Sequence, residues 1–405
     1  MPLKPFRTLA QLAGTCLLAA AAALSGCVSN PPVLPQGPQT LSLAVQRLAD
    51  DLIEQTDPTV IERMAARKVV LDPFIEAQSG QQTASSRKAG ELLVERLKAR
   101  NSSLKLQAFD AAGVAQADYL IAGILRKNQS GSGSGSGGSS SAYTLHATLT
   151  ERRTGLVIAS AVSSVQAGEI DATPTPFYAD SPSIVSDRLT QGYVKTSQAA
   201  RGAAADQVYL ASISTGALVQ EATTAYDEGR PGDALLRYQS AVQRPDGKQL
   251  RVFNGLYNSH TRLGHAAEAE GAFSQIVALG LATNNLAVRL LFNPGSTEFW
   301  RDRSVSTIYP MWLRQIAAET TAGDYCLTVV GHTSKTGTEA VNERLSLSRA
   351  RYVRDALLAQ DRQLASRVEV AGVGWQENII GSGTDDARDS VDRRVEFKVR
   401  TCKGA

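Results

Sequence analysis

The sequence predicts a multidomain fold of the α/β plus α kind: a mixed α/β domain, then a short helical segment, then a C-terminal domain with the order βαβαββ. Three observations predict it. Residues 68–165 hold strand-like apolar runs around one helical stretch, and residues 226–273 repeat at helical spacing. Segments after Leu286 alternate between strand and helix patterns, which favours a mixed sheet covered by helices on one face.

Residues 1–26 have the pattern of a secretory signal peptide. Lys4 and Arg7 precede an apolar run over 12–24, which is too short for a transmembrane helix, and no acidic residue interrupts them. The C-terminal end of the signal peptide and the next residue read LSGC, ending at Cys27, which resembles the lipobox of bacterial lipoproteins. The resemblance implies cleavage before Cys27 and acyl lipid, such as palmitate, on the mature N-terminal cysteine. The alternative is a signal peptide that is followed by a chance cysteine.

The residues after Cys27 predict where the chain is anchored. Val28 stands where an Asp would indicate retention in the inner membrane, so the outer membrane, with the protein on its periplasmic face, is favoured. Residues 27–40 are rich in proline and polar residues and read as a tether. No later apolar run approaches the roughly 20 residues of a transmembrane helix.

The charge balance is nearly neutral. The formal charge of +3 falls by two when Lys4 and Arg7 leave with the signal peptide. This balance gives no reason to expect nucleic acid as a partner. No cofactor is expected.

The sequence contains four cysteines, and a role can be predicted for each of them. Cys16 leaves with the signal peptide and Cys27 is expected to carry lipid. Cys326 and Cys402 then remain, and an oxidising periplasm favours one disulfide between them. Two buried free thiols are the alternative.

Residues 41–170 are predicted to form the mixed α/β domain. Residues 41–67 have helical spacing, KVVLDPFIEA is strand-like, and SSRKAGELLVERLKAR predicts a helix opened by a Ser cap. Three further strands are expected in QADYLIAGILRK, AYTLHATLTERR and GLVIASAVSSV. The Gly/Ser tract 130–141 between two of them predicts a mobile hairpin loop. The order of these motifs resembles CsgG, FlgO and LpoB-type lipoproteins, which implies an interaction domain.

Residues 171–215 read as a connector that packs on its neighbours, and a repeat follows over 216–284. Its positions recur 35 residues apart, in the pairs Gly229 and Gly264, Ala234 and Ala269, and Tyr238 and Phe273. This spacing resembles two tetratricopeptide repeats, which implies a groove that binds a protein partner. The alternative is a set of helices that only packs the flanking domains together.

Residues 286–402 carry the most specific motifs. GHTSKTG, NERLSLSRARYV and DRRVEFKV resemble the OmpA-like, peptidoglycan-associated domain family. Helices are expected over 304–320 and 339–359, and strands in LAVRLLF, YCLTVVGHT, RVEVAGVGW and RRVEFKVR. In the fold that this resemblance implies, the strands that bear Cys326 and Cys402 are antiparallel neighbours, so the two cysteines would meet at one edge.

The second of these helices carries an unusual arginine. At about 100° per residue, Asn342 and Arg349 fall within the apolar arc that holds Leu345, Ala350 and Val353. An arginine there needs a partner, because burying an unpaired cation is costly. One alternative is an internal salt bridge to one of four nearby aspartates, which are Asp385, Asp386, Asp389 and Asp392.

The family resemblance implies the other alternative, a pocket for the diaminopimelate of the peptidoglycan stem peptide. Arg349 matches the arginine that meets the ligand carboxylate, and Asn342 is expected to order the loop. Ser334 stands where the family has an aspartate for the ligand ammonium, so Ser334 and Thr333 are expected to give weaker polar contacts. Lys335 would repel that ammonium. The closing motif of this domain is Asp392-Arg393-Arg394. Asp392 would either restore negative charge to the pocket or neutralise Arg349. Arg393 is a further candidate wall-binding residue.

The sequence has no HExxH pairing, and no GxSxG elbow or SxxK signature stands at a plausible site for an enzyme. We therefore expect a noncatalytic outer-membrane lipoprotein that tethers the envelope to peptidoglycan, with protein partners on the helical repeats or the N-terminal domain. The alternative is an assembly or regulatory subunit of an envelope machine, such as a secretion system, a flagellum or a peptidoglycan synthase. Its OmpA-like domain would bind protein instead of wall.

Overall fold

The computed structural model describes residues 37–56, 68–100, 105–128, 142–288, 290–293, 295–379, 383, 389 and 392–402. The predicted signal peptide, Cys27 and the Gly/Ser tract 130–141 lie outside the described residues. So do Asp385 and Asp386.

The first sheet has the strand order β3-β1-β4-β5-β6, with β2 paired to β4. Parallel pairs join β1 to β3 and β4, and β2 to β4, whereas β4, β5 and β6 form an antiparallel meander. The strands are β1 (Lys68–Leu71), β2 (Ile75–Glu76), β3 (Lys105–Gln107), β4 (Tyr119–Lys127), β5 (Ala142–Glu151) and β6 (Leu156–Gln166). The predicted mixed sheet is confirmed.

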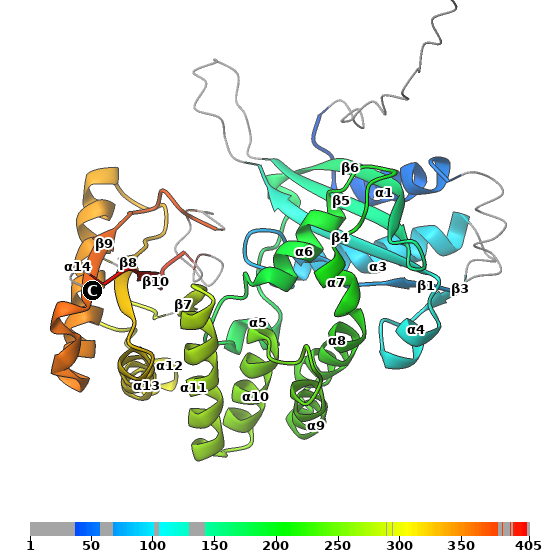
Figure 1. The fold of residues 1–405 in the computed structure, drawn as a ribbon. Coiled ribbons are helices and arrows are strands. Elements are labelled where there is room, and N and C mark those ends of the chain that lie inside the picture. The colour runs from blue at the N-terminus through cyan, green and yellow to red at the C-terminus, as the bar shows by residue number, and fades with distance from the viewer. Residues whose placement is uncertain are drawn as a thin grey trace, which may run out of the picture. The chain divides into compact units, whose positions relative to one another are not determined.

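Strand β4 lies between two hydrophobic cores, which explains its unbroken apolar run. Ile121 and Leu125 face the core that contains helices α1 (Leu41–Glu54) and α3 (Ala84–Arg100). Leu120 and Ile124 alternate with them and face the core formed with α6 (Arg188–Ser197) and α7 (Gln207–Ala211). The helices therefore cover both faces of this sheet (Figure 1).

The start of α3 differs from the prediction. The helix begins at Ala84, and the residue that caps it is Thr83, whose Oγ1 accepts a hydrogen bond from Ser86 N at 3.2 Å. Ser86 Oγ in turn accepts from Thr83 N at 2.9 Å. The expected Ser cap was wrong because the serine occupies the reciprocal place of a capping box, inside the first turn.

Two helical hairpins follow, α8 (Ile213–Asp227) with α9 (Pro231–Val242) and α10 (Leu250–Arg262) with α11 (Ala266–Ala282). Gly229 and Gly264 occupy equivalent turns with φ of 75° and 76°, a backbone that other residues rarely adopt. Tyr238 and Phe273 are both fully buried at equivalent positions. The 35-residue spacing of the sequence thus corresponds to two similar helix pairs.

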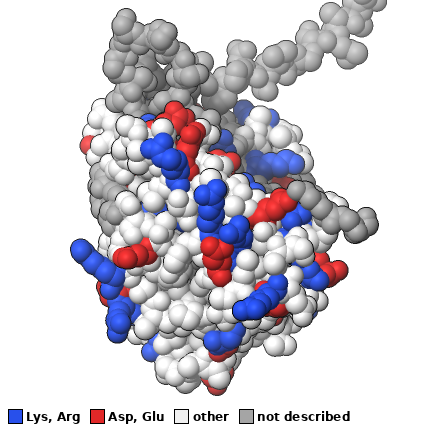
Figure 2. Space-filling view, turned by 90° about the vertical axis from the view of Figure 1, so that its left-hand side faces the viewer, with Lys and Arg blue, Asp and Glu red and all other residues white. Residues whose placement is uncertain are grey.

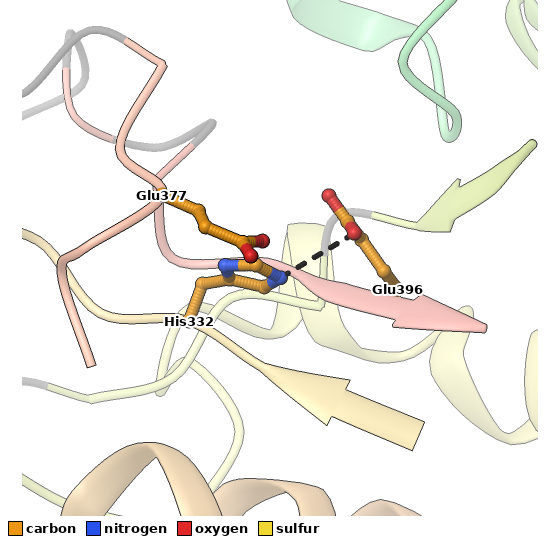
Figure 3. A group of neighbouring side chains, drawn as sticks. All are labelled: His332, Glu377 and Glu396. Atoms are coloured by element: carbon orange, nitrogen blue, oxygen red, sulfur yellow. Dashed lines mark ion pairs between the residues drawn. The ribbon is translucent and has the colours of Figure 1, made fainter. Parts of the chain in front are cut away.

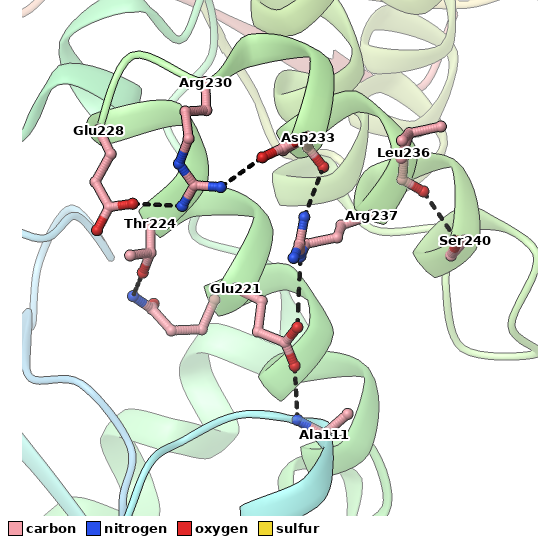
Figure 4. A network of polar contacts seen from close by, with 10 residues as sticks. Ala111, Glu221, Thr224, Glu228, Arg230, Asp233, Leu236, Arg237 and Ser240 are labelled. Atoms are coloured by element: carbon pink, nitrogen blue, oxygen red, sulfur yellow. Dashed lines mark hydrogen bonds and ion pairs between the residues drawn. The ribbon is translucent and has the colours of Figure 1, made fainter.

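The helical segment is joined to the first domain by a polar network on α8 and α9 (Figure 4). Glu221 on α8 accepts from the backbone N of Ala111 at 2.7 Å, where α4 (Ala111–Gln116) begins. Its other oxygen lies 3.4 Å from Arg237 Nε on α9. The connector also contributes, because α5 (Pro176–Asp180) packs Phe177 against Tyr238.

The C-terminal sheet has the order β7-β10-β8-β9, in which β10 is antiparallel to β7 and β8, and β9 is parallel to β8. Its strands are β7 (Leu286–Val288), β8 (Cys326–Gly331), β9 (Val368–Gly372) and β10 (Val395–Arg400), and its helices are α12 (Arg303–Ser306), α13 (Tyr309–Ala322) and α14 (Glu339–Gln360). The predicted βαβαββ order is confirmed. The first helix is split in two because Pro310, which cannot donate a backbone hydrogen bond, stands in the first turn of α13.

Cys326 and Cys402 form a disulfide. Cys326 begins β8 and pairs with Arg400 at the end of β10, so the antiparallel register brings the two cysteines together at one end of these two central strands. The predicted pairing is confirmed. None of the described helices combines the length and the apolar character that a membrane span needs.

Candidate functional site

The pocket candidates lie where β8 ends and α14 begins. Gly331 and Gly372 let this helix approach the sheet closely, because a Cβ at Gly331 would lie 2.1 Å from Ser346 O and one at Gly372 would lie 2.3 Å from Leu347 N. The buried side of α14 consists of Asn342, Ser346, Arg349, Ala350, Val353 and Leu357. The helix therefore presents a polar start and an apolar end to the sheet.

Arg349 is buried, with 2 % of its surface exposed. Its Nε donates to Ser296 O at 3.1 Å and its Nη2 donates to Asn293 O at 3.2 Å, so the turn that follows β7 orients the guanidinium. The guanidinium also lies over the ring of Phe292, 5.0 Å from its centroid. Sequence reasoning missed this turn; the Pro294-Gly295 pair after an apolar strand was the signal that could have indicated it.

The loop from Thr333 to Thr338 is also buried where it was expected to meet a ligand. Thr333 and Ser334 are 1 % and 4 % exposed. Ser334 Oγ lies 3.5 Å from Thr336 Oγ1. Asn342 Nδ2 donates to the carbonyls of Thr336 at 2.7 Å and of Thr338 at 3.1 Å, which holds the loop against the first turn of α14.

A second loop, residues 373–379, braces the first. Thr333 N donates to Gly374 O at 2.9 Å. Asn378, with its amide nitrogen turned toward the loop, donates to Thr333 O at 2.8 Å and accepts from Lys335 N at 3.3 Å. Lys335 Nζ lies over the Trp375 ring, 5.2 Å from its centroid. The positive charge beside Ser334 is therefore held by an aromatic face.

The closing motif, Asp392-Arg393-Arg394, lies beside the same loop because it leads into β10, which pairs with β8. His332 N donates to Arg394 O at 3.1 Å, which continues the ladder that pairs Val395 with Gly331. Arg393 is 6 % exposed, and Asp392 is fully buried, where its Oδ1 accepts from Ile379 N at 2.6 Å. The structure thus gathers Thr333, Ser334 and Asn342 around one loop, with the closing motif joined to it at His332.

An ionic cluster lies beneath this loop (Figure 3). His332 Nε2 lies 3.6 Å from Glu396 Oε2, and Arg394 Nη2 lies 2.7 Å from Glu396 Oε1. Burial opposes ionisation of Glu396, but His332 and the Arg394 charge outweigh it and hold the pKa of Glu396 well below its usual value. Burial lowers the pKa of His332, although the contact with Glu396 acts in the opposite direction.

The other histidines do not share this environment. Burial in β5 lowers the pKa of His146 to about 4. His260 and His265 flank the turn at Gly264, with their Nδ1 atoms 3.3 Å apart. Across the part of the chain that the structure describes, one group of three side chains brings potential metal-ligand atoms within 4.8 Å of one another: His332, Glu377 and Glu396.

The surface of the C-terminal domain carries mixed charge. On the face in Figure 2, basic and acidic side chains are interspersed and are not gathered by sign. Ion pairs of this domain include Arg400 with Glu369 and Lys398 with Glu396.

Comparisons with known proteins identify this region. Residues 291–391 match the model of the OmpA family. Outer membrane protein Omp38 of Acinetobacter baumannii is 40 % identical over 67 residues, which are 16 % of this chain and 18 % of that protein. Outer membrane porin F of Pseudomonas aeruginosa is 39 % identical over 72 residues, 18 % of this chain and 20 % of that protein.

A solved structure, the peptidoglycan-associated lipoprotein of Burkholderia pseudomallei, aligns with 28 % of this chain and 89 % of its own at 23 % identity, with a TM-score of 0.23. The family match falls on the domain that holds Arg349, β8 and α14. The C-terminal part of this chain is an OmpA-like domain.

Proposed function

We propose that this protein is a noncatalytic outer-membrane lipoprotein that tethers the envelope to peptidoglycan through its OmpA-like domain. The family match and the relatives named as outer-membrane proteins support an envelope role. Cys27 would carry the lipid at one end, and the loop before α14 would meet the wall at the other. Protein partners would bind the helical hairpins or the N-terminal domain.

The observation that carries the proposal is the buried guanidinium of Arg349. Backbone carbonyls of Asn293 and Ser296 accept hydrogen bonds from it, and the planar guanidinium is the side-chain group whose shape best suits a carboxylate. The stem-peptide residue diaminopimelate offers such a carboxylate. Arg349 would therefore hold the wall peptide, and Arg393 would add positive charge at the same end of the sheet.

Ser334 weakens this site in the proposed complex. A hydroxyl can accept from the ligand ammonium but brings no charge, and charged hydrogen bonds stabilise by about 1.5–3 kcal/mol against roughly 1 for neutral ones. The affinity would be lower by about 5- to 30-fold than with an aspartate. Lys335 adds repulsion of the ammonium.

The test is co-sedimentation of the chain that starts after Cys27 with diaminopimelate-type sacculi. We expect wild type to pellet, Arg349→Ala to stay in solution, and Ser334→Asp to pellet more strongly. Arg351→Ala is the matched control, because Arg351 is exposed on the same helix. Equal pelleting of Arg349→Ala and wild type would contradict the proposal.

The second candidate function is an assembly or regulatory subunit of an envelope machine, such as a secretion system, a flagellum or a peptidoglycan synthase, whose OmpA-like domain binds protein. Ser334 in place of an acid, beside Lys335, favours it. Under this reading wild type stays in solution with sacculi, Ser334→Asp pellets, and a stable assembly co-purifies without wall material.

The lipid anchor is tested separately. We expect Cys27→Ser to move the protein from the membrane fraction to the soluble periplasmic fraction, because the acyl chains supply the hydrophobic attachment. The sacculus binding of this variant should be unchanged, so the two ends of the tether can be examined independently.

A further inference from the structure

Three side chains from three segments of the C-terminal domain lie close together next to the loop from Thr333 to Thr338. His332 follows the end of β8, Glu396 lies in β10, and Glu377 belongs to the loop after β9. One potential ligand atom from each lies within 4.8 Å of the others. Figure 3 shows both carboxylates turned toward the imidazole.

The imidazole of His332 is the unusual member of this group. Its side chain is 0 % exposed, and neither Nδ1 nor Nε2 has a hydrogen-bond partner among the described residues. Buried polar atoms are normally satisfied, so an imidazole without a hydrogen bond that faces two carboxylates requires an explanation. Its contact with Glu396 Oε2, at 3.6 Å, is too long for a hydrogen bond.

The 3.6 Å between His332 Nε2 and Glu396 Oε2 fits two ligands of one bound ion better than it fits a direct hydrogen bond. In a tetrahedral site with bonds of about 2.0–2.2 Å, neighbouring ligand atoms lie roughly 3.3–3.5 Å apart. His332 and Glu396 already have nearly this spacing. Glu377 is exposed on a loop, so its carboxylate can move inward without disturbing the core.

A cation already occupies the space between the carboxylates. Lys398 Nζ lies 3.6 Å from Glu377 Oε2 and 3.6 Å from Glu396 Oε2, and 47 % of the Lys398 side chain is exposed. Exposed ion pairs of this kind contribute little to stability, so the lysine can swing into solvent. Arg394 binds the opposite oxygen of Glu396 and leaves Oε2 directed at His332.

We propose that His332, Glu377 and Glu396 form a binding site for a divalent transition-metal ion of the Zn²⁺ class. One imidazole and two carboxylates suit Zn²⁺ and its neighbours, whereas Mg²⁺ and Ca²⁺ prefer oxygen ligands alone. The ion would displace Lys398 and fasten loop 373–379 to β8 and β10. Because Asn378 in that loop bonds to Thr333 and Lys335, the ion would also fix the loop that holds Ser334.

The test is titration of untagged, chelator-treated full-length protein in detergent with Zn²⁺ by calorimetry, and with Co²⁺ by visible absorption. We expect one ion per chain. Glu377→Gln should weaken binding by about tenfold or more, since changes even outside the first ligand shell cost 10- to 100-fold. Lys398→Met, which removes the competing cation, should tighten binding several-fold.

The control is the double variant His260→Gln, His265→Gln, which removes the exposed histidine pair. Binding that survives in this double variant and weakens in Glu377→Gln supports the site. The absence of stoichiometric binding overturns the proposal. Binding that is unchanged in Glu377→Gln, or lost in the double variant, overturns it as well, because the ion is then held elsewhere. Glu377 is exposed, so its variant is expected to fold, which far-UV circular dichroism checks.

Discussion

Phe273 of α11 stacks on Trp312 of α13, with ring centroids 5.2 Å apart and an angle of 10° between the ring planes. Trp312 Nε1 also donates to Tyr257 Oη of α10 at 3.1 Å. The last helical hairpin and the OmpA-like domain therefore share one hydrophobic core, which continues through Ile276, Val277 and Leu313.

The first prediction concerns this shared core. Trp312→Ala should lower the free energy of unfolding by about 3–5 kcal/mol, because it leaves a cavity and removes a buried aromatic pair. Urea denaturation followed by circular dichroism measures the loss. Leu236→Ala, at a side chain that is 64 % exposed on α9, is the control and should change stability by less than about 0.5 kcal/mol. An unchanged midpoint in Trp312→Ala would show that α11 and α13 do not pack together in solution.

The second prediction concerns the disulfide. In a chain that starts after Cys27, thiol titration under denaturing, non-reducing conditions should find no free thiol. The double variant Cys326→Ala, Cys402→Ala should lose about 4.5 kcal/mol of stability in the chain-entropy model, since the bridge closes a loop with a sequence separation of 76. Two reactive thiols in the untreated protein would refute the pairing.

The third prediction concerns Glu76, which is 1 % exposed in β2. Burial raises its pKa to about 7, although the backbone N–H of Ser79 donates to it at 2.7 Å. The folded state therefore binds a proton more tightly than the unfolded state does. This contribution to stability is fully present below the unfolded pKa of 4.5 and is lost as the pH rises to about 7.

Urea midpoints at pH 5 and pH 8 measure this effect. Glu76→Gln should reduce the fall in stability between the two values, because the amide keeps an acceptor oxygen for Ser79 but cannot ionise. Glu91→Gln, on the exposed side of α3, should retain the full fall. The assigned pKa would be contradicted if wild type were equally stable at pH 5 and pH 8 and Glu76→Gln showed the same change in urea midpoint as wild type.

The fourth prediction concerns the close approach of α14 to β8. Gly331→Ala should destabilise the OmpA-like domain and abolish sacculus binding, because the new Cβ would meet the Ser346 carbonyl at 2.1 Å. Gly271→Ala is the matched control on α11, where a Cβ meets no atom within 4 Å. That control should stabilise the chain by roughly 0.5–1 kcal/mol, since alanine is the better helix former. Equal stability of the two variants would show that the helix does not need this contact.

Much of the fold followed from local patterns. The alternation in β5 and β6, the apolar run of β4 and the helical spacing of α14 each predicted an element whose position the structure confirms. The disulfide was also predicted, because two cysteines remained for an oxidising periplasm and the OmpA-like resemblance implied neighbouring strands for them; the structure confirms the pairing. The capping residue of α3 was not, because Thr83 and Ser86 are both good caps and only the backbone geometry distinguishes their roles.

The amino-acid sequence indicated the order of the segments and the burial of Arg349, because hydrophobic periodicity depends only on which residues share a face. The OmpA-like assignment came from the resemblance of the GHTSKTG, NERLSLSRARYV and DRRVEFKV motifs to that family. The tertiary structure alone decided which groups meet: Arg349 with the carbonyls of Asn293 and Ser296, α11 with α13, and His332 with Glu396. These contacts join residues far apart in the chain. Their distances are set by strand register and helix packing, which no local pattern records.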